Sequence, residues 1–400
     1  EMEDIGMENR TEELLKIGVI GMGNCGGQMA NLASEYGFAA IAINASEKDL
    51  NLLTSESIVT IPVGDGKGTG KNRDEAAEFF LNRINMVQDP VVSKFVDSSD
   101  VIVVASSIGG GFGSGSSLIL VDVLNKMTGG SKVIIPAGVI PFDDESYTAQ
   151  NHAIAWLKEL MDMDLSYLLY DNNIFKSIPK KEAHVKINEQ FVMDLKVMRG
   201  DMILPTTSGG IDNRDMLTAI SIPGRIVVDA MPLLEAADVI DDSIVKTIRK
   251  HIKDESAHAE MVDDKVIKAS ALMYTLRNEF NAYKPNLKTE VQTEFGVHLN
   301  DYDNFVDLDE TEDSDATKDS VAIILTGLSA PNLRIDRLIS KRDKLEADIL
   351  GQKTGSSKLA NAGTGNDILK VRAKSFADPS AEKKTNTADF LAGYVANRKK

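Results

Sequence analysis

Short apolar stretches alternate with segments of helical spacing between residue 17 and about residue 180. Apolar runs that we interpret as strands lie at 17–20, 38–43, 58–61, 101–105, 133–136 and 167–170. Residues 74–86 and 117–126 place apolar side chains at the spacing of a helix. This alternation predicts an α/β fold in which helices cover both faces of a Rossmann-type parallel sheet.

The second half of the chain reads as a smaller α/β region. The pattern predicts a helix over 188–201, a loop over 206–210, strands over 225–229 and 321–325, and a charged amphipathic helix over 332–350. From residue 351 onward glycine, serine, asparagine and lysine are common and aromatic residues are few, so we expect little fixed structure there. Residues 388–396 have apolar residues at helical spacing, which suits either folding on a partner or a solubilising tail end.

Two glycine-rich turns each follow a predicted strand directly. The first covers residues 21–28 (GMGNCGGQ) and the second covers residues 109–115 (GGGFGSG). Glycines between a strand and a helix let backbone N–H groups approach an anion, and the helix N-terminus favours negative charge. Because ligands bind at the carboxyl ends of parallel strands, the two turns together predict a polyphosphate held from two sides.

Two other phosphate-binding motifs fit this chain less well. The spacing Gly21-x-Gly23-x-x-Gly26 satisfies a dinucleotide fingerprint, but the second predicted strand ends at the uncharged Asn44-Ala45-Ser46, where the fingerprint wants an acidic residue to hold the ribose. Residues 64–72 contain glycines and two lysines but lack the spacing of a Walker loop. This segment suits either a flexible loop that closes over an anion or an ordinary surface loop.

Asp212 and Asp215 lie three residues apart at the start of a predicted helix. At that spacing both carboxylates project from one face of the first helical turn. Capping and the helix dipole are sufficient reasons for acidic residues at this position. The pair is also suited to activating a water molecule or holding a metal ion, and the sequence leaves both interpretations open.

Composition and charge narrow the class of protein. The net charge of −17 over 400 residues argues against direct nucleic-acid binding by the body of the protein. An acidic run at 301–319 does not fit the EF-hand pattern, and we interpret it as a solvated face. Cys25 is the single cysteine, which fits a reducing compartment, and no apolar run approaches the ~20 residues of a membrane helix. We therefore expect a cytoplasmic protein without membrane contact.

The C-terminal segment differs in charge from the rest of the chain. Residues 351–400 contain ten basic and four acidic residues, a net charge of +6, so the preceding residues carry −23. Such an asymmetry suits contact with a neighbour's acidic body or recruitment of a DNA-binding adaptor.

The motifs together resemble the tubulin/FtsZ family. The second turn resembles the signature G-G-G-T-G-[ST]-G, and residues 23–28 are similar to the first nucleotide loop of tubulins. Asp212-Asn213-Arg214-Asp215 matches the D-x-x-D loop that the family carries after its central helix. The long basic tail is most similar to the plasmid and phage branch of the family, TubZ and PhuZ.

The resemblance implies a tubulin/FtsZ-like architecture. It assigns a GTP-binding domain to residues 1–185, a central helix to 186–208, and a smaller α/β activation domain with the catalytic loop at its start to 209–331. A C-terminal helix over 332–350 and a flexible basic tail over 351–400 complete the expected organisation.

The resemblance also implies the residues of a guanine-nucleotide site. Those expected to contact GTP or GDP are Gly23, Asn24, Cys25, Gln28, Asn44, Gly109, Gly110, Gly111, Phe112, Gly113, Ser114, Glu145, Asn172 and Asn188. Glu145 matches the ribose-binding acid, while Asn172 and Asn188 match residues that meet ribose and guanine. Phe112 occupies the position of the signature threonine, so a hydroxyl that normally meets phosphate is missing.

The activity implied is GTP hydrolysis coupled to assembly. One subunit would hold Mg²⁺-GTP, and Asp212 and Asp215 of the next subunit in a head-to-tail filament would activate the attacking water. Such a dynamic polymer suits the movement of plasmid or phage DNA. Three alternatives are a nucleotide-binding scaffold with little hydrolysis, which Phe112 motivates, an FtsZ-like cell-division protein, and a nicotinamide-dependent enzyme, which fits least well.

Overall fold

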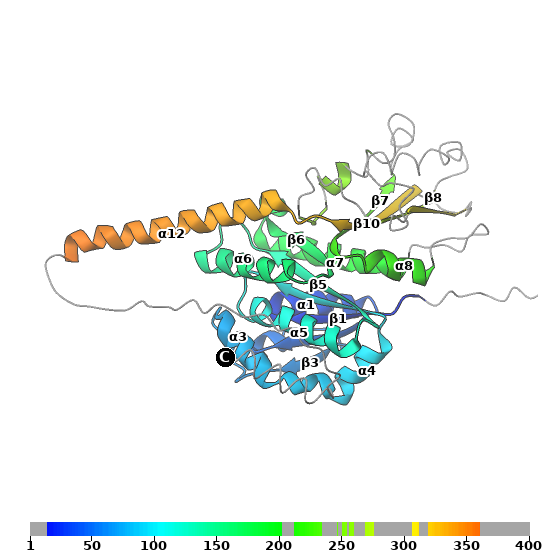
Figure 1. Ribbon diagram of the computed structural model, residues 1–400, viewed down its shortest axis with the longest axis horizontal. Helices are drawn as coiled ribbons and strands as arrows, with labels where there is room; N and C mark the ends of the chain where they lie inside the picture. Colours follow the sequence, from blue (N-terminus) through cyan, green and yellow to red (C-terminus); the bar gives the residue numbers. More distant parts are fainter. Residues whose placement is uncertain are drawn as a thin grey trace, which may run out of the picture.

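Ten strands form a single sheet in the computed structural model, which describes residues 14–201, 212–233, 246, 250–253, 256–259, 269–275, 306–311 and 319–360 (Figure 1). The strands are β1 (Ile17–Met22), β2 (Ala39–Asn44), β3 (Val59–Pro62), β4 (Val101–Ser107), β5 (Val133–Ile140), β6 (Ser166–Asp171), β7 (Gly224–Leu233), β8 (Ala269–Thr275), β9 (Val306–Thr311) and β10 (Asp319–Leu328). Their order in the sheet is β3-β2-β1-β4-β5-β6-β7-β10-β8-β9.

Helices connect these strands. They are α1 (Gly23–Glu35), α2 (Glu47–Leu50), α3 (Arg73–Asn82), α4 (Pro90–Ser98), α5 (Phe112–Thr128), α6 (Tyr147–Met161), α7 (Lys180–Arg199), α8 (Asn213–Ile220) and α12 (Asn332–Ala360). Two short 3₁₀ helices, η1 (Ile84–Gln88) and η2 (Asn172–Phe175), follow α3 and β6. Among the residues described, no helix is both long and apolar enough to span a bilayer.

The predicted parallel α/β sheet is confirmed. Strands β1 to β7 pair in parallel, and all eight strands expected from the sequence occur within a few residues of their expected bounds. The chain reverses the strand order between β1 and β4, which are hydrogen-bonded neighbours. In sheets of this kind, ligands usually bind at the carboxyl ends of the strands where the order reverses, which here are the ends of β1 and β4.

Beyond β7 the sheet becomes mixed. Strand β10 is antiparallel to both β7 and β8, whereas β8 and β9 run parallel to each other. Strands β8 and β9 were not expected from the sequence. Residues 306–311 lie inside the acidic run interpreted as a solvated face, and that interpretation misses an edge strand whose sequence alternates apolar and acidic residues.

Three predicted helices have different bounds in the structure. The expected 74–86 helix ends at Asn82 and continues after Arg83 as η1. Helix α7 begins at Lys180, directly after Pro179, which is six residues earlier than the expected residue 186. It ends at Arg199, because Gly200 adopts a left-handed conformation with φ 91°. Helix α12 runs to Ala360, so residues 351–360 are helical, contrary to the expectation of little fixed structure there. The division into domains itself stays a prediction.

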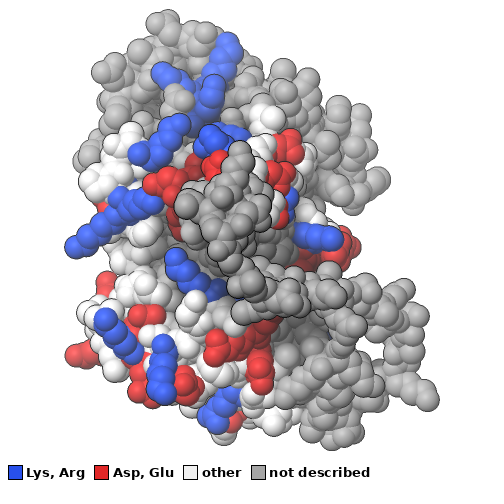
Figure 2. All heavy atoms as spheres, turned by 90° about the vertical axis from the view of Figure 1, so that its left-hand side faces the viewer, with Lys and Arg blue, Asp and Glu red and all other residues white. Residues whose placement is uncertain are grey.

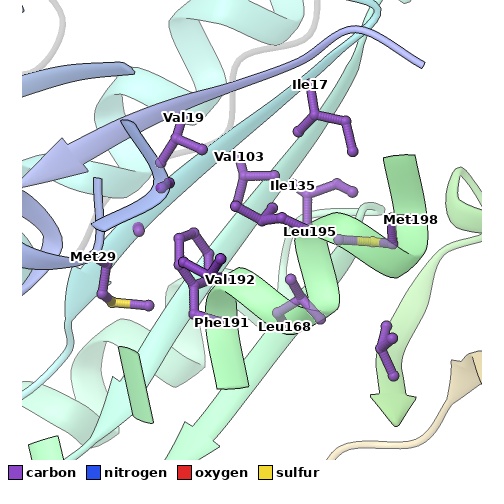
Figure 3. Close-up of a cluster of buried hydrophobic side chains, with 14 of the residues drawn as sticks. Ile17, Val19, Met29, Val103, Ile135, Leu168, Phe191, Val192, Leu195 and Met198 are labelled. Atoms are coloured by element: carbon purple, nitrogen blue, oxygen red, sulfur yellow. The ribbon is translucent and has the colours of Figure 1, made fainter. Parts of the chain in front are cut away.

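The core lies on both faces of the sheet. On one face, strand residues such as Val19, Val103 and Leu168 pack against Phe191 and Leu195 of α7 (Figure 3). On the other face, side chains of α3, α4 and α5 form a second apolar cluster, and α6 and α12 contribute a third around Trp156. The sheet is therefore enclosed by helices from both sides, which fixes the positions of its carboxyl-end loops.

Candidate functional site

The two glycine-rich segments lie side by side at the carboxyl ends of β1 and β4. In both segments the helix begins early: α1 starts at Gly23 and α5 at Phe112, so several of the glycines belong to the first helical turns. A Cβ atom built on Gly23 would lie 3.1 Å from the backbone nitrogen of Gly113. The N-termini of two helices thus meet at one point of the sheet edge.

Glycine is required here because backbones approach closely. A Cβ on Gly26 would lie 2.1 Å from the carbonyl oxygen of Ala105, and one on Gly115 would lie 2.3 Å from that of Arg73. Both distances are far below van der Waals contact, so a side chain at Gly26 would push α1 away from β4, and one at Gly115 would push α5 away from α3. These glycines hold the two helix N-termini in place rather than contact a ligand themselves.

The same two helix N-termini carry no side-chain cap. Neither Met22 before α1 nor Gly111 before α5 accepts a helix N–H with its side chain, and neither first turn contains an acidic residue. In α5 the N–H of Gly115 makes the first intrahelical bond, to the oxygen of Gly111 at 3.0 Å. The preceding N–H groups have no helical acceptor, and the helix dipole adds positive potential beside them, which is the chemistry of a phosphate site.

The side chains of the second turn make other contacts and do not supply donors for a phosphate. Phe112 is buried in the apolar cluster on the α5 face of the sheet. The hydroxyl of Ser114 donates to the oxygens of Gly110 and Gly111, and that of Ser116 donates to the oxygen of Phe112 at 2.6 Å. Backbone N–H groups are therefore the donors that this turn offers, and the missing threonine hydroxyl is not replaced by either serine.

His152 of α6 is a contact of the turn that sequence reasoning missed. Its Nδ1 lies 2.9 Å from the oxygen of Gly110, which also accepts from Ser114. A carbonyl only accepts, so His152 donates from Nδ1; burial lowers the pKa of its imidazole below the usual 6.5. Because a peptide group is planar and trans, holding the Gly110 oxygen on the α6 side turns the N–H of Gly111 to the opposite side. No short motif marks His152, which lies 42 residues from Gly110.

The loop between β3 and α3 covers the second turn. A Cβ on Gly111 would lie 2.6 Å from Thr69 Oγ1 and 2.7 Å from Lys71 Cα, and Arg73 Nε donates to the oxygen of Ser114 at 3.0 Å. Lys71 has a positive φ of 65°, and four glycines of the loop are also in this region. The lysine-bearing loop that the sequence singled out thus lies against the glycine turn.

Asn44 and Asn24 differ in exposure at the same sheet edge. Asn44 ends β2 and is buried, with Nδ2 at 3.3 Å from Asp49 Oδ2 and Oδ1 accepting from the N–H of Ser46 at 3.2 Å. Asn24 is exposed on the first turn of α1, and Gln28 is half-buried one helical turn further on. The side chain of Asn44 is already engaged, whereas that of Asn24 is open to a ligand.

Cys25 lies beside Glu145. Burial raises the pKa of the Cys25 thiol from 9.0 to about 12, and the nearby Glu145 carboxylate adds to the effect. The thiol is therefore protonated at neutral pH, which supports a small residue that fits the turn rather than a reactive nucleophile. Glu145, in the loop after β5, is half-buried and accepts from the N–H of Phe142 through Oε1 at 3.1 Å.

Asn172 has a buried side-chain oxygen that receives no hydrogen bond from the described residues. The residue directly follows β6 and is 5% exposed. A buried amide oxygen without a donor is costly, so a ligand that supplies a donor would stabilise it. Asn188, expected at the start of the central helix, lies in the third turn of α7 because that helix begins at Lys180.

The carboxylates Asp212 and Asp215 form a capping box at the start of α8. Asp212 Oδ1 accepts from the N–H groups of Arg214 and Asp215 at 2.7 and 2.8 Å, and Asp215 Oδ2 accepts from the N–H of Asp212 at 3.2 Å. Asp212 is exposed and Asp215 half-buried. Capping is thus established for this pair, and it leaves the second oxygen of each carboxylate without a hydrogen bond to the described residues.

The structure does not bring these carboxylates to the glycine turns. Lys180, at the first turn of α7, pairs with Asp144 after β5 at 2.8 Å, whereas the oxygen of Arg199 at the far end accepts from Leu15 before β1 at 3.2 Å. Helix α7 therefore crosses the sheet from its carboxyl edge to its amino edge, about 30 Å for 20 residues. Helix α8 leads into the amino end of β7 and lies at the opposite end of the molecule from α3 (Figure 1).

No cluster of three or more His, Cys, Asp or Glu residues suited to a metal occurs among the residues that the structure describes. The loop that lies against the second turn carries three cations, namely Arg73, which contacts Ser114, and the exposed Lys67 and Lys71, of which Lys67 pairs with Asp65 at 3.5 Å. The protein groups at this edge thus suit an anion, and a Mg²⁺ ion here would need phosphate oxygens among its ligands.

Comparisons with known proteins agree with this geometry. Residues 16–180 match the GTPase domain of the tubulin/FtsZ family. The tubulin-like protein CetZ of Pyrococcus abyssi is 26% identical over 228 residues, which cover 54% of this chain and 56% of the relative. The chain thus spans about half the length of the curated relatives it matches.

Solved structures extend the likeness to most of the chain. The TubZ of Clostridium botulinum phage c-st aligns with a TM-score of 0.65 and 18% identity, covering 83% of this chain and 99% of that one. CetZ2 from Haloferax volcanii, solved as a GTPγS-bound protofilament, also aligns with a TM-score of 0.65, at 18% identity over 85% of this chain and 100% of that one. The fold therefore does not distinguish the TubZ branch from CetZ, and the predicted branch stays a prediction. Residues 16–180 therefore resemble the GTPase domain of the tubulin/FtsZ family, and the chain as a whole has the fold of TubZ and CetZ2.

Proposed function

We propose that this protein binds GTP and GDP at the carboxyl ends of β1 and β4. The observation that carries the proposal is the meeting of two uncapped helix N-termini, α1 and α5, at one point of the sheet. The phosphates lie against the backbone N–H groups of this junction, with the loop over 64–73 beside them. Asn172 Oδ1, buried without a donor, receives a hydrogen bond from the nucleoside.

Hydrolysis on this proposal takes place between two copies of the chain. Asp212 and Asp215 lie about the length of α7 from the glycine turns, so one chain does not complete the site alone. When subunits stack head to tail, the α8 end of one meets the nucleotide of the next. The carboxylate oxygen that is not used in capping then orients the attacking water, and a bound Mg²⁺ ion would supply neutralisation of the phosphate charge.

Such stacking produces a linear filament because the two contacting surfaces differ. A heterologous interface of this kind leaves a free end of each type and continues without closing. CetZ2 from Haloferax volcanii, which has the same fold, was solved as a protofilament. Assembly creates the active site, so hydrolysis follows assembly, and loss of the γ-phosphate weakens the contact that holds the filament together.

The test is a combined measurement of GTPase rate and right-angle light scattering against protein concentration. Scattering is expected to rise on addition of GTP but not of ATP or NADH, and the GTPase rate per subunit is expected to increase where scattering begins. A rate per subunit that stays constant from dilute to concentrated protein would show that a single chain holds the whole site, and would contradict the composite arrangement.

A scaffold with little hydrolysis is the second candidate, favoured by the burial of Phe112 in place of a phosphate-contacting hydroxyl. Asp212→Ala separates the two. For a GTPase the substitution abolishes turnover and lengthens the lifetime of the filaments, whereas for a scaffold neither changes. Asn213→Ala, in the same turn, serves as the matched control because it leaves both carboxylates in place.

The cellular role that we propose is the positioning of plasmid or phage DNA in the cytoplasm through an adaptor. Lysine and arginine side chains are interspersed with acidic ones on the described part of the face in Figure 2, which supports a body that does not bind nucleic acid directly. The basic residues beyond 360, outside the described part of the chain, are the proposed adaptor contact. Deleting residues 361–400 is expected to abolish adaptor binding and leave GTP-dependent scattering intact.

A further inference from the structure

A buried arginine of α12 ties the C-terminal helix to the loops of the proposed nucleotide site. Arg334, in the first turn of α12, has no exposed surface. Its Nε donates to Asp171 Oδ2 at 2.6 Å and its Nη2 to the oxygen of Pro141 at 2.7 Å, while Nη1 lies 2.9 Å from Asp143 Oδ1. Two of the three guanidinium nitrogens thus donate hydrogen bonds, and the third forms an ion pair with Asp143 without a hydrogen bond, in each case with a group far away in the sequence.

Those groups belong to two loops at the carboxyl edge of the sheet. Pro141 and Asp143 follow β5 and lead to Glu145, whereas Asp171 ends β6 and directly precedes Asn172. The loops are also joined to each other: Asn173 Nδ2 donates to Asp143 Oδ2 at 3.1 Å, and Asn173 Oδ1 accepts from the N–H of Asp143 at 3.4 Å. Arg334 therefore fixes the spacing of the segments that carry Glu145 and Asn172 without contacting either residue.

Burying this ion pair costs desolvation free energy, so the pair contributes little net stability to the fold. Burial raises the pKa of Asp171 even though Arg334 and Arg337 act in the opposite direction, so desolvation is the larger effect on this carboxyl. Replacing a buried ion pair by apolar side chains of similar size is often neutral or stabilising, whereas removing one partner alone is strongly destabilising. The distinctive property of a planar, forked cation is the geometry that it imposes on several acceptors at once.

We propose that Arg334 is a positioning residue through which the seating of α12 sets the affinity of the site for guanine nucleotide. The inference rests on the proposed function, because it concerns Glu145 and Asn172 as nucleotide contacts. Coupling between the helix and the nucleotide is reciprocal, so bound nucleotide also holds the first turn of α12 in its seat. Helix α12 extends well beyond the body of the molecule (Figure 1). A contact made along this helix would therefore also change how firmly its first turn is seated, and with it the affinity for nucleotide.

The test compares nucleotide affinity with stability in four proteins. Arg334→Met removes the charge, Arg334→Lys keeps the charge but not the fork, and Arg334→Met with Asp171→Asn removes both buried charges together. Arg342→Met, at a half-buried position of α12 where the arginine pairs with the exposed Asp343, is the matched control. Each is measured for its dissociation constant for a fluorescent GDP analogue, and for its melting temperature without and with saturating GDP.

We expect Arg334→Met to weaken GDP binding by about tenfold or more and Arg334→Lys by several-fold, with Arg342→Met unchanged. The double variant is expected to regain the melting temperature of the nucleotide-free protein but not its affinity, and to show a smaller GDP-induced shift.

Wild-type affinity in Arg334→Lys or in the double variant would overturn the inference, because Arg334 would then serve stability alone. Absence of GDP binding to the wild-type protein is a different result, which would overturn the proposed function and this inference with it.

Discussion

Gly26 and Gly27 are adjacent in α1 but have different surroundings. A Cβ on Gly26 would lie 2.1 Å from the Ala105 oxygen, whereas one on Gly27 would have Leu53 as its nearest neighbour at 3.8 Å. Neither glycine has a positive φ, so the surroundings alone separate the two positions. They form a matched pair in which the same substitution tests whether the close approach of α1 to β4 is real.

Gly26→Ala is expected to destabilise the protein by about 1–3 kcal/mol, the usual cost of forcing an atom into a packed interior. Gly27→Ala is expected to be neutral or to stabilise by up to about 1 kcal/mol, since alanine favours a helix more than glycine does. Urea unfolding followed by circular dichroism measures both. Equal effects of the two substitutions would contradict the packing described for α1.

Cys25 provides a pH test at the same site. Its pKa of about 12 in the folded protein, against 9.0 for an ordinary thiol, means that the thiolate is scarce at pH 8. Reaction with a disulfide reagent is expected to be slow in the folded protein and fast in urea. The folded state binds this proton more tightly, so stability is complete below pH 9 and falls as pH rises towards 12. Equal reaction rates in folded and unfolded protein would contradict the burial of the thiol.

His152 tests the orientation of the second turn. Its hydrogen bond to the Gly110 oxygen fixes the peptide that turns the Gly111 N–H outward. His152→Ala is expected to weaken GDP binding about two- to tenfold, the range for loss of one hydrogen bond. Affinity for guanosine, which lacks phosphates, is expected to stay unchanged. A parallel loss for guanosine would show a general disturbance of the site.

At the scale of elements, the parallel part of the sheet could be predicted from the sequence. Its strands are continuous apolar runs because helices cover both faces, and such runs stand out against the polar loops. Strand β9 lacks that signal, since it alternates Val306 and Leu308 with Asp307 and Asp309. The helix predicted over 332–350 ends ten residues before α12 does, because Gly351, Gly355 and the serines after Gly355 have low helix propensity.

The candidate site could be predicted only where it is local in sequence. The glycine turns and the carboxylate pair are short motifs, so their positions follow from the strands and helices that precede them. His152, Asp171 and Arg334 act through contacts between residues 42 to 193 positions apart, which depend on how helices pack on the sheet. The burial of Phe112 likewise follows from the direction in which α5 leaves β4 and not from the motif.

At the scale of the whole molecule, the central claim is that the two halves of the proposed catalytic site lie at opposite ends of the folded molecule. Two variants separate these halves. Gly110→Asp places a carboxylate among the phosphate-binding groups, at a position where a Cβ has no neighbour closer than 3.9 Å. Asp212→Asn keeps the capping geometry but removes the charge from the other end. Gly110→Ala, which adds the Cβ without the charge, is the control.

The most direct measurement is therefore the GTPase rate of Gly110→Asp and Asp212→Asn, each alone and mixed in equal amounts. Each variant alone is expected to be inactive. In a mixed filament the Asp212→Asn subunit supplies GTP and its Gly110→Asp neighbour supplies the carboxylates, so about a quarter of the interfaces are complete when subunits join at random. Recovery of activity to about that fraction of the wild-type rate is the predicted result. A mixture no more active than its two components would contradict a site shared between subunits.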